Sequence, residues 1–152
     1  MTRKALLRWL PPAIWMALIF TGSTDRGSSQ HTGGFIEPLL RWLLPHAAQA
    51  TIETLHFLVR KCAHLTEYGI LRILVLRALA PESPEAFREK RGKWVLWAVG
   101  ISALYACSDE FHQIFVPSRG ASIDDVLLDT CGAAVGIGAF LLWRMRHDKM
   151  AR

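Results

Sequence analysis

The stretch SDEFHQIFVPSRGASIDD, residues 108–125, places many ionisable side chains between two strongly apolar segments, 94–108 and 122–143. Each ionisable group at membrane depth costs roughly 3 kcal/mol or more, so such groups usually face a cavity or pair with one another. The sequence therefore predicts a polar site embedded in a membrane protein.

The overall composition agrees with one membrane domain. The chain has 152 residues, of which 51% are hydrophobic and 20% charged, and no Pro/Ser/Gly-rich linker divides it. Its net charge is +5, but the basic residues flank apolar segments instead of forming a basic face, which argues against nucleic acid as a partner. Three cysteines lie inside apolar stretches without regular spacing, and this indicates packed thiols, not a disulfide framework.

Four apolar segments predict an all-α fold, with residues 1–152 forming a single integral membrane bundle of four transmembrane helices. The segments lie at about 5–22, 51–80, 94–108 and 122–143, and a continuation of the third through the polar motif stays open. Between the first two, FIEPLLRWLL (residues 35–44) is too short to span a bilayer and contains Pro38. We expect this piece to be re-entrant or interfacial.

The distribution of Lys and Arg predicts the orientation of the bundle. The N-terminus carries three, the 81–93 connection four and the C-terminal tail four, whereas the 23–50 connection has two and the 109–121 loop one. Basic short loops stay in the cytoplasm. Both termini of this multi-pass protein are therefore expected inside the cytoplasmic (inner) membrane, with the polar motif at its outer face.

Polar residues recur at helical spacing on the second predicted helix. Lys61, His64 and Tyr68 follow an i, i+3, i+7 pattern, and Glu67 lies three residues after His64 on an adjoining part of the same face. A histidine and a carboxylate three residues apart can share a proton, hydrogen-bond one another or jointly hold a divalent cation.

The fourth predicted helix carries a second stripe. Its residues are Ser122, Asp125, Asp129, Gly132 and Gly136, which follow the helical spacing i, i+3, i+7, i+10 and i+14. The two glycines form a G-x-x-x-G pattern that lets two helix backbones approach closely. The carboxylates then line a pocket above that contact.

These residues divide into two sets of candidates. The candidate catalytic residues are His64, Glu67, Glu110, His112 and Asp125. The candidate substrate-binding residues are Lys61, Tyr68, Asp109, Gln113, Arg119, Ser122 and Asp129. No spacing among them is diagnostic of a metal site, so we assign no metal ligand, and the sequence names no cofactor. Two structural alternatives stay open: ion pairs that only fix the bundle, and an ordinary solvated loop at 109–113.

At three blocks the chain resembles the VanZ-like family of small bacterial membrane proteins associated with teicoplanin resistance. The matching residues are Lys61, His64 and Tyr68; Asp109 to Arg119, which fit D-E-x-H-Q-x-F-x-P-x-R; and Ser122, Asp125, Gly132 and Gly136. The chain departs from the family pattern at Ser118, where glycine is common, and at Asp129, where asparagine is common. The resemblance implies a four-helix membrane protein with an envelope or glycopeptide phenotype.

Two functions fit this pattern. In the first, an enzyme acts at the outer leaflet, with His64 or His112 as general base and Lys61 and Arg119 binding phosphate or carboxylate. In the second, the same pocket belongs to a non-catalytic accessory protein. For either function the expected partners are the lipid bilayer and an amphipathic envelope molecule: a lipid-linked envelope precursor, a phospholipid headgroup or a lipoglycopeptide.

Overall fold

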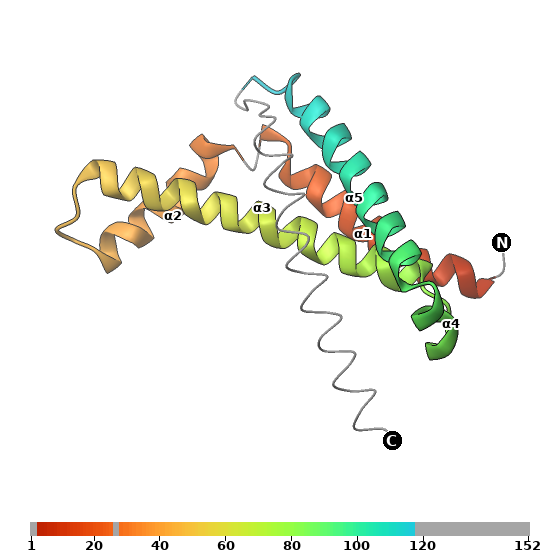
Figure 1. Ribbon diagram of the computed structural model, residues 1–152. Coiled ribbons are helices and arrows are strands. Elements are labelled where there is room, and N and C mark those ends of the chain that lie inside the picture. The colour runs from red at the N-terminus through yellow and green to blue at the C-terminus, as the bar shows by residue number, and fades with distance from the viewer. Residues whose placement is uncertain (1–2, 26–27, 118–152) are drawn as a thin grey trace.

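The computed structural model describes residues 3–25 and 28–117, and the remaining residues form the grey trace of Figure 1. In these described ranges every regular element is a helix: α1 (Arg3–Gly22), α2 (Ser29–Leu43), α3 (Gln49–Leu79), α4 (Pro84–Glu89) and α5 (Arg91–Gln113). The all-α prediction is confirmed for this part of the chain. The predicted helix 122–143 lies outside the described residues.

The element boundaries match the apolar segments closely. α1 and α3 each lie within two residues of the predicted bounds. The third apolar segment was expected at about 94–108 or to continue through the polar motif, and α5 does continue to Gln113. The short segment 35–44 belongs to the helix α2, which begins earlier, where the Ser28 Oγ accepts a hydrogen bond from the His31 N–H.

The helix α3 is the axis of the fold. Its 31 residues extend about 46 Å at 1.5 Å per residue. α2 packs along its N-terminal half, whereas α1 and α5 cross its C-terminal half (Figure 1). Within the described residues, α3 therefore packs with α1 and α5 at one end and with α2 at the other.

The apolar core lies where three helices meet. On α3, the fully buried side chains Leu71, Val75 and Leu76 form its centre. On α5, Ala98, Ser102 and Ala106 are buried at four-residue intervals, and such small residues allow close helix approach. The remaining buried members of the core are Ile19, Tyr68, Ala80 and Phe87.

Polar contacts fix the direction of the helices. The Arg8 guanidinium of α1 donates hydrogen bonds to the backbone oxygens of Arg77 and Ala80, at the end of α3. A cation there satisfies carbonyl groups that the helix leaves without partners. At the other end of α1, the Ser23 hydroxyl donates to Asp109 of α5. α1 and α5 thus run in the same direction and α3 runs against them.

By length and composition, α1 is the one helix in the described part of the chain that is apolar enough to cross a membrane. α3 is longer, but it carries several charged residues along its length. α2 has 15 residues and extends about 22 Å, which is less than the roughly 30 Å of a bilayer's hydrocarbon core.

Candidate functional site

The described helices bury polar side chains and expose large apolar ones. Fully or nearly buried polar residues include His56, Arg72, Ser102, Asp109, Glu110 and Gln113. By contrast, α1 exposes a series of large apolar side chains, namely Leu6, Leu7, Leu10, Ile14, Leu18 and Phe20. This is the reverse of the usual pattern in a water-soluble protein. The candidate site therefore lies inside the bundle.

Asp109 is the centre of a polar contact among three helices. Its Oδ2 accepts hydrogen bonds from the Ser23 hydroxyl (2.5 Å), the Tyr68 hydroxyl (3.1 Å) and the Gln113 amide (3.2 Å). Its side chain is only 2% exposed. Among the described residues, its second oxygen, Oδ1, has no hydrogen-bond partner. The predicted residues Tyr68, Asp109 and Gln113 are thus brought together, and Ser23 joins them.

The other two residues of the motif on α5 have different surroundings. Glu110 is buried, and its Oε1 accepts a hydrogen bond of 3.4 Å from the Gln113 amide. The His112 ring instead packs on the Phe20 ring of α1, with centroids 4.5 Å apart and planes 31° apart. The 109–113 segment is therefore packed in the bundle, and the alternative of a solvated loop is wrong.

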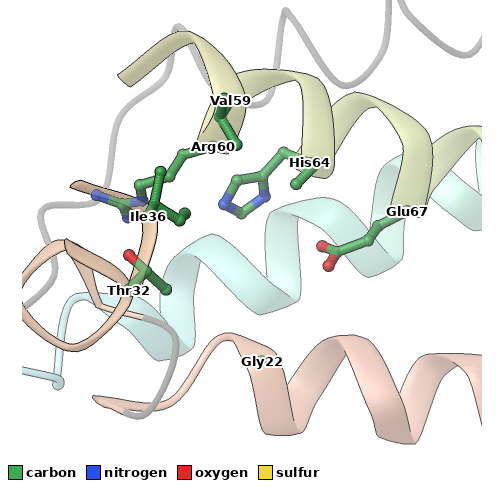
Figure 2. A pocket seen from close by; sticks show the side chains of 8 residues that line it. Gly22, Thr32, Ile36, Val59, Arg60, His64 and Glu67 are labelled. Carbon is green, nitrogen blue, oxygen red and sulfur yellow. The ribbon is translucent and has the colours of Figure 1, made fainter. Parts of the chain in front are cut away.

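The polar residues of α3 divide between two places. Tyr68 points to Asp109, as above. Lys61 lies with its Nζ 5.2 Å from the centroid of the Phe57 ring. His64 and Glu67 line a cavity of about 170 Å³ between α1, α2 and α3 (Figure 2).

The lining of this cavity combines charged and apolar groups. Among the described residues, it consists of Gly22, Thr32, Ile36, Val59, Arg60, Ala63, His64 and Glu67. In Figure 2, Arg60 extends towards Ile36 and Thr32, Glu67 lies at the opposite end, and His64 lies between the two. Among the described residues, the lining includes His64 but not His112, so these two histidines are not shown in one pocket.

Arg60 is the main cavity residue that the sequence analysis missed. Arg60, His64 and Glu67 are spaced i, i+4, i+7, which places all three on one helix face, so a signal was present. Within residues 3–25 and 28–117, the Arg60 guanidinium has no hydrogen-bond or ion-pair partner. A partly buried cation that faces a cavity without a partner is suited to bind an anion.

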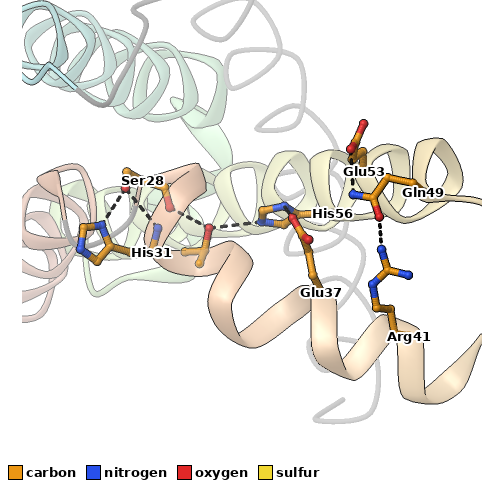
Figure 3. A network of polar contacts seen from close by, with 8 residues as sticks. Ser28, His31, Glu37, Arg41, Gln49, Glu53 and His56 are labelled. Carbon is orange, nitrogen blue, oxygen red and sulfur yellow. Dashed lines mark hydrogen bonds and ion pairs between the residues drawn. The ribbon is translucent and has the colours of Figure 1, made fainter.

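Polar contacts hold α2 against α3 beside the cavity (Figure 3). The His56 ring is 5% exposed, with its Nδ1 3.6 Å from a Glu37 oxygen and its Nε2 3.3 Å from the Thr32 hydroxyl. The same hydroxyl donates to the Ser28 backbone oxygen at 2.8 Å. Further along, Arg41 donates to Gln49, which donates to Glu53. These contacts set the position of Thr32 and therefore one wall of the cavity.

Four of the predicted site residues, Arg119, Ser122, Asp125 and Asp129, lie outside the described residues. Of the others, Tyr68, Asp109, Glu110 and Gln113 form one cluster and His64 and Glu67 line the cavity, as given above. In the part of the chain that the structure describes, no three His, Cys, Asp or Glu side chains lie close enough to share a metal ion. Ser23, His56 and Arg72 are buried polar residues that the sequence analysis did not single out.

Comparison with known protein families gives a match over most of the chain. A profile of the VanZ/LLP1 family matches residues 9–144, which include the three motif blocks and all of the cavity residues. No curated protein and no solved structure matches the chain.

Proposed function

The chain belongs to the VanZ/LLP1 family, and we propose that it is a multi-pass protein of the cytoplasmic membrane that binds an amphipathic cell-envelope molecule. The binding site in this proposal is the cavity between α1, α2 and α3, and the consequence is altered susceptibility to glycopeptides of the teicoplanin type. The observation that carries the proposal is the joint presence of Arg60, His64 and Glu67 in that cavity.

The surface of the helices supports residence in the membrane. Besides the exposed leucines of α1, the helix α5 exposes Leu96, Trp97, Leu104 and Phe111. Contact of such side chains with lipid tails carries no hydrophobic penalty, whereas their contact with water does. In this proposal α1, α3 and α5 cross the bilayer, residues 122–143 supply the fourth span, and the polar groups of α3 and α5 face the bundle interior.

The positions of the charged ends support the orientation. The contacts of Arg8 with Arg77 and Ala80 bring the basic N-terminus beside the end of α3, where the basic 81–93 connection begins. The Asp109 cluster and the cavity lie towards the other end of α1, near Ser23 and Gly22. With the basic end in the cytoplasm, the polar cluster lies on the outer side.

Apolar lining residues support an amphipathic ligand. Ile36 and Val59 form part of the same wall as Arg60 and His64. A headgroup placed against the charged residues therefore has its apolar part near these two side chains. A ligand with both a polar and an apolar part satisfies both kinds of surface.

Catalysis is the second candidate, and one observation favours it. His64 and Glu67 line the same cavity, so the pair predicted as base and orienting carboxylate can act on one bound molecule. Replacing the general base of an enzyme lowers its activity by about 10²- to 10⁴-fold. A binder instead loses affinity in a graded way that follows the charge of its site.

The test is carried out in cells that express the chain. We would replace His64 by Ala and Glu67 by Gln, and use His46→Ala as the matched control, because His46 is exposed outside the cavity. Teicoplanin susceptibility and the amount of protein in the membrane are measured together. We expect the two cavity variants to lose the phenotype at normal abundance and the control to keep it. An unchanged phenotype in both cavity variants would contradict the proposal.

A further inference from the structure

We infer that the group bound in the cavity is a phosphate of a lipid headgroup, held by the guanidinium of Arg60. This inference rests on the proposed function and names the chemical class of its ligand. It makes Arg60, which matches none of the family motifs quoted above, the principal binding residue of the site.

The first support is the charge of the cavity. Arg60 is partly buried and, among the described residues, has no anionic partner. Leaving a cation partly desolvated without a partner is unfavourable, and an anion in the cavity removes that penalty. Arginine presents a planar fork of donors that fits two oxygens of a phosphate or carboxylate at once.

The second support is the position of His64 beside Arg60 in the same cavity. A carboxylate has two oxygens, and the arginine fork uses both of them when it binds side-on. The phosphate of a lipid diester has two non-bridging and two ester oxygens. With the fork on one non-bridging and one ester oxygen, the second non-bridging oxygen is left for the imidazole of His64. Glu67 lies at the opposite end of the cavity (Figure 2) and repels a second anion there. This arrangement selects one phosphate group, placed at the Arg60 end.

The third support is the size of the cavity and its surroundings. A volume of about 170 Å³ is well below the roughly 300–1,000 Å³ of pockets that enclose whole drug-sized ligands. It holds a headgroup but not the acyl chains. Val59, which lines the cavity, is itself 44% exposed and gives acyl chains an apolar surface at its edge.

The experiment uses the purified full chain in detergent and native mass spectrometry to measure bound ligand. The probes are short-chain phosphatidylglycerol, the matching diacylglycerol without phosphate, a fatty acid of the same length, and inorganic phosphate. The variants are Arg60→Ala, Arg60→Lys and the control Arg77→Ala, which removes an equal charge from an exposed position on the same helix. Circular dichroism checks that each variant keeps its helix content.

We expect the wild-type chain and Arg77→Ala to bind phosphatidylglycerol in preference to diacylglycerol and fatty acid. Loss of the charge-assisted hydrogen bonds in Arg60→Ala weakens this binding about 10- to 100-fold. Arg60→Lys keeps the charge but not the fork of donors, so its affinity for phosphatidylglycerol falls between those of the wild-type chain and Arg60→Ala. Weak binding of inorganic phosphate, competitive with the lipid, completes the expected result.

The other outcomes separate the two proposals. Three results overturn the phosphate assignment and leave an amphipathic ligand. They are diacylglycerol bound as tightly as phosphatidylglycerol, the fatty acid bound as tightly as phosphatidylglycerol, and unchanged affinity in Arg60→Ala. Inorganic phosphate bound as tightly as the lipid identifies a free-phosphate site and overturns the lipid source. If the wild-type chain binds none of the amphiphiles, the proposed function fails as well.

Discussion

The two halves of α3 are packed in different ways. Its C-terminal half, from Tyr68 onward, is enclosed by α1 and α5, and Leu71, Val75 and Leu76 are fully buried there. Its N-terminal half packs mainly on α2, with Gly22 at the end of α1 beside the cavity, and Phe57 and Leu58 remain exposed. One long helix therefore joins a close-packed bundle to a thinner region that contains the cavity.

This difference in packing assigns the stability of the fold mainly to the C-terminal half of α3 and the proposed ligand binding to its N-terminal half. The C-terminal half of α3 is closely packed in the described structure, whereas polar contacts hold the N-terminal half beside the cavity. The Asp109 cluster lies at the boundary, since Tyr68 is the point on α3 where the two regions meet. Substitutions in the two halves should consequently affect different measurements.

The largest expected effect on stability is that of Leu76→Ala. Truncating a fully buried leucine removes its packing contacts and leaves a cavity, which lowers the free energy of unfolding by about 2–5 kcal/mol. Leu58→Ala, in the other half of α3, should lower it by less than about 0.5 kcal/mol, because Leu58 is exposed. Denaturant titration in mixed micelles measures both. Similar losses for the two variants would remove the distinction between the halves.

Asp109→Ala tests the boundary between the halves. The substitution leaves the donors of Ser23, Tyr68 and Gln113 without their common acceptor, and we expect a loss of about 2–3 kcal/mol in the free energy of unfolding. The control is Ser108→Ala, because Ser108 is exposed and its hydroxyl donates to the backbone oxygen of Tyr105 on its own helix. The same titration serves for this pair. Equal stability of the two variants would mean that the cluster does not hold the helices together.

His56→Ala should act only on the thinner region. Removing the ring breaks its contacts with Thr32 and Glu37, so α2 opens more readily, by about 1 kcal/mol. Hydrogen exchange at the amides of α2 should become faster while exchange in α5 stays unchanged. The exposed His46, replaced by Ala, is the control. Faster exchange in both helices would indicate that the two halves unfold as one unit.

The helices themselves could be predicted because their signals are local. Apolar runs flanked by Lys and Arg gave α1 and α3 within two residues of their bounds. The end of α5 was left open between Ser108 and the polar motif because the apolar run stops there, whereas Asp109 and Glu110 lie inside the helix and are buried. The sequence alone does not distinguish a polar residue that ends a helix from one that lies in a buried helix interface, because the neighbouring helix is not known.

The site was predictable only in part, for a related reason. Spacing placed Lys61, His64 and Tyr68 on neighbouring positions of one helix, but the facing helices decide where each side chain goes. The Tyr68 hydroxyl donates a hydrogen bond to Asp109 of α5, whereas His64 lines the cavity beside α2. Ser23 had no signal, because a serine after a helix is common, and its contact with Asp109 spans 86 residues. Helical periodicity cannot specify such distant pairs.

The smallest expected effect compares two adjacent glycines of α2. A Cβ on Gly33 would lie 3.2 Å from a Glu37 oxygen and 3.4 Å from the His56 Cε1, whereas a Cβ on Gly34 meets nothing within 4 Å. Alanine at either position gains about 1 kcal/mol of helix propensity over glycine. Gly34→Ala should keep this gain, and hydrogen exchange in α2 should slow. Gly33→Ala should keep less of it, because Glu37 must move away from His56 to make room. Equal slowing in both variants would show that α2 lies further from α3 than the His56 contacts require, and the polar attachment of the thinner half would have to be abandoned.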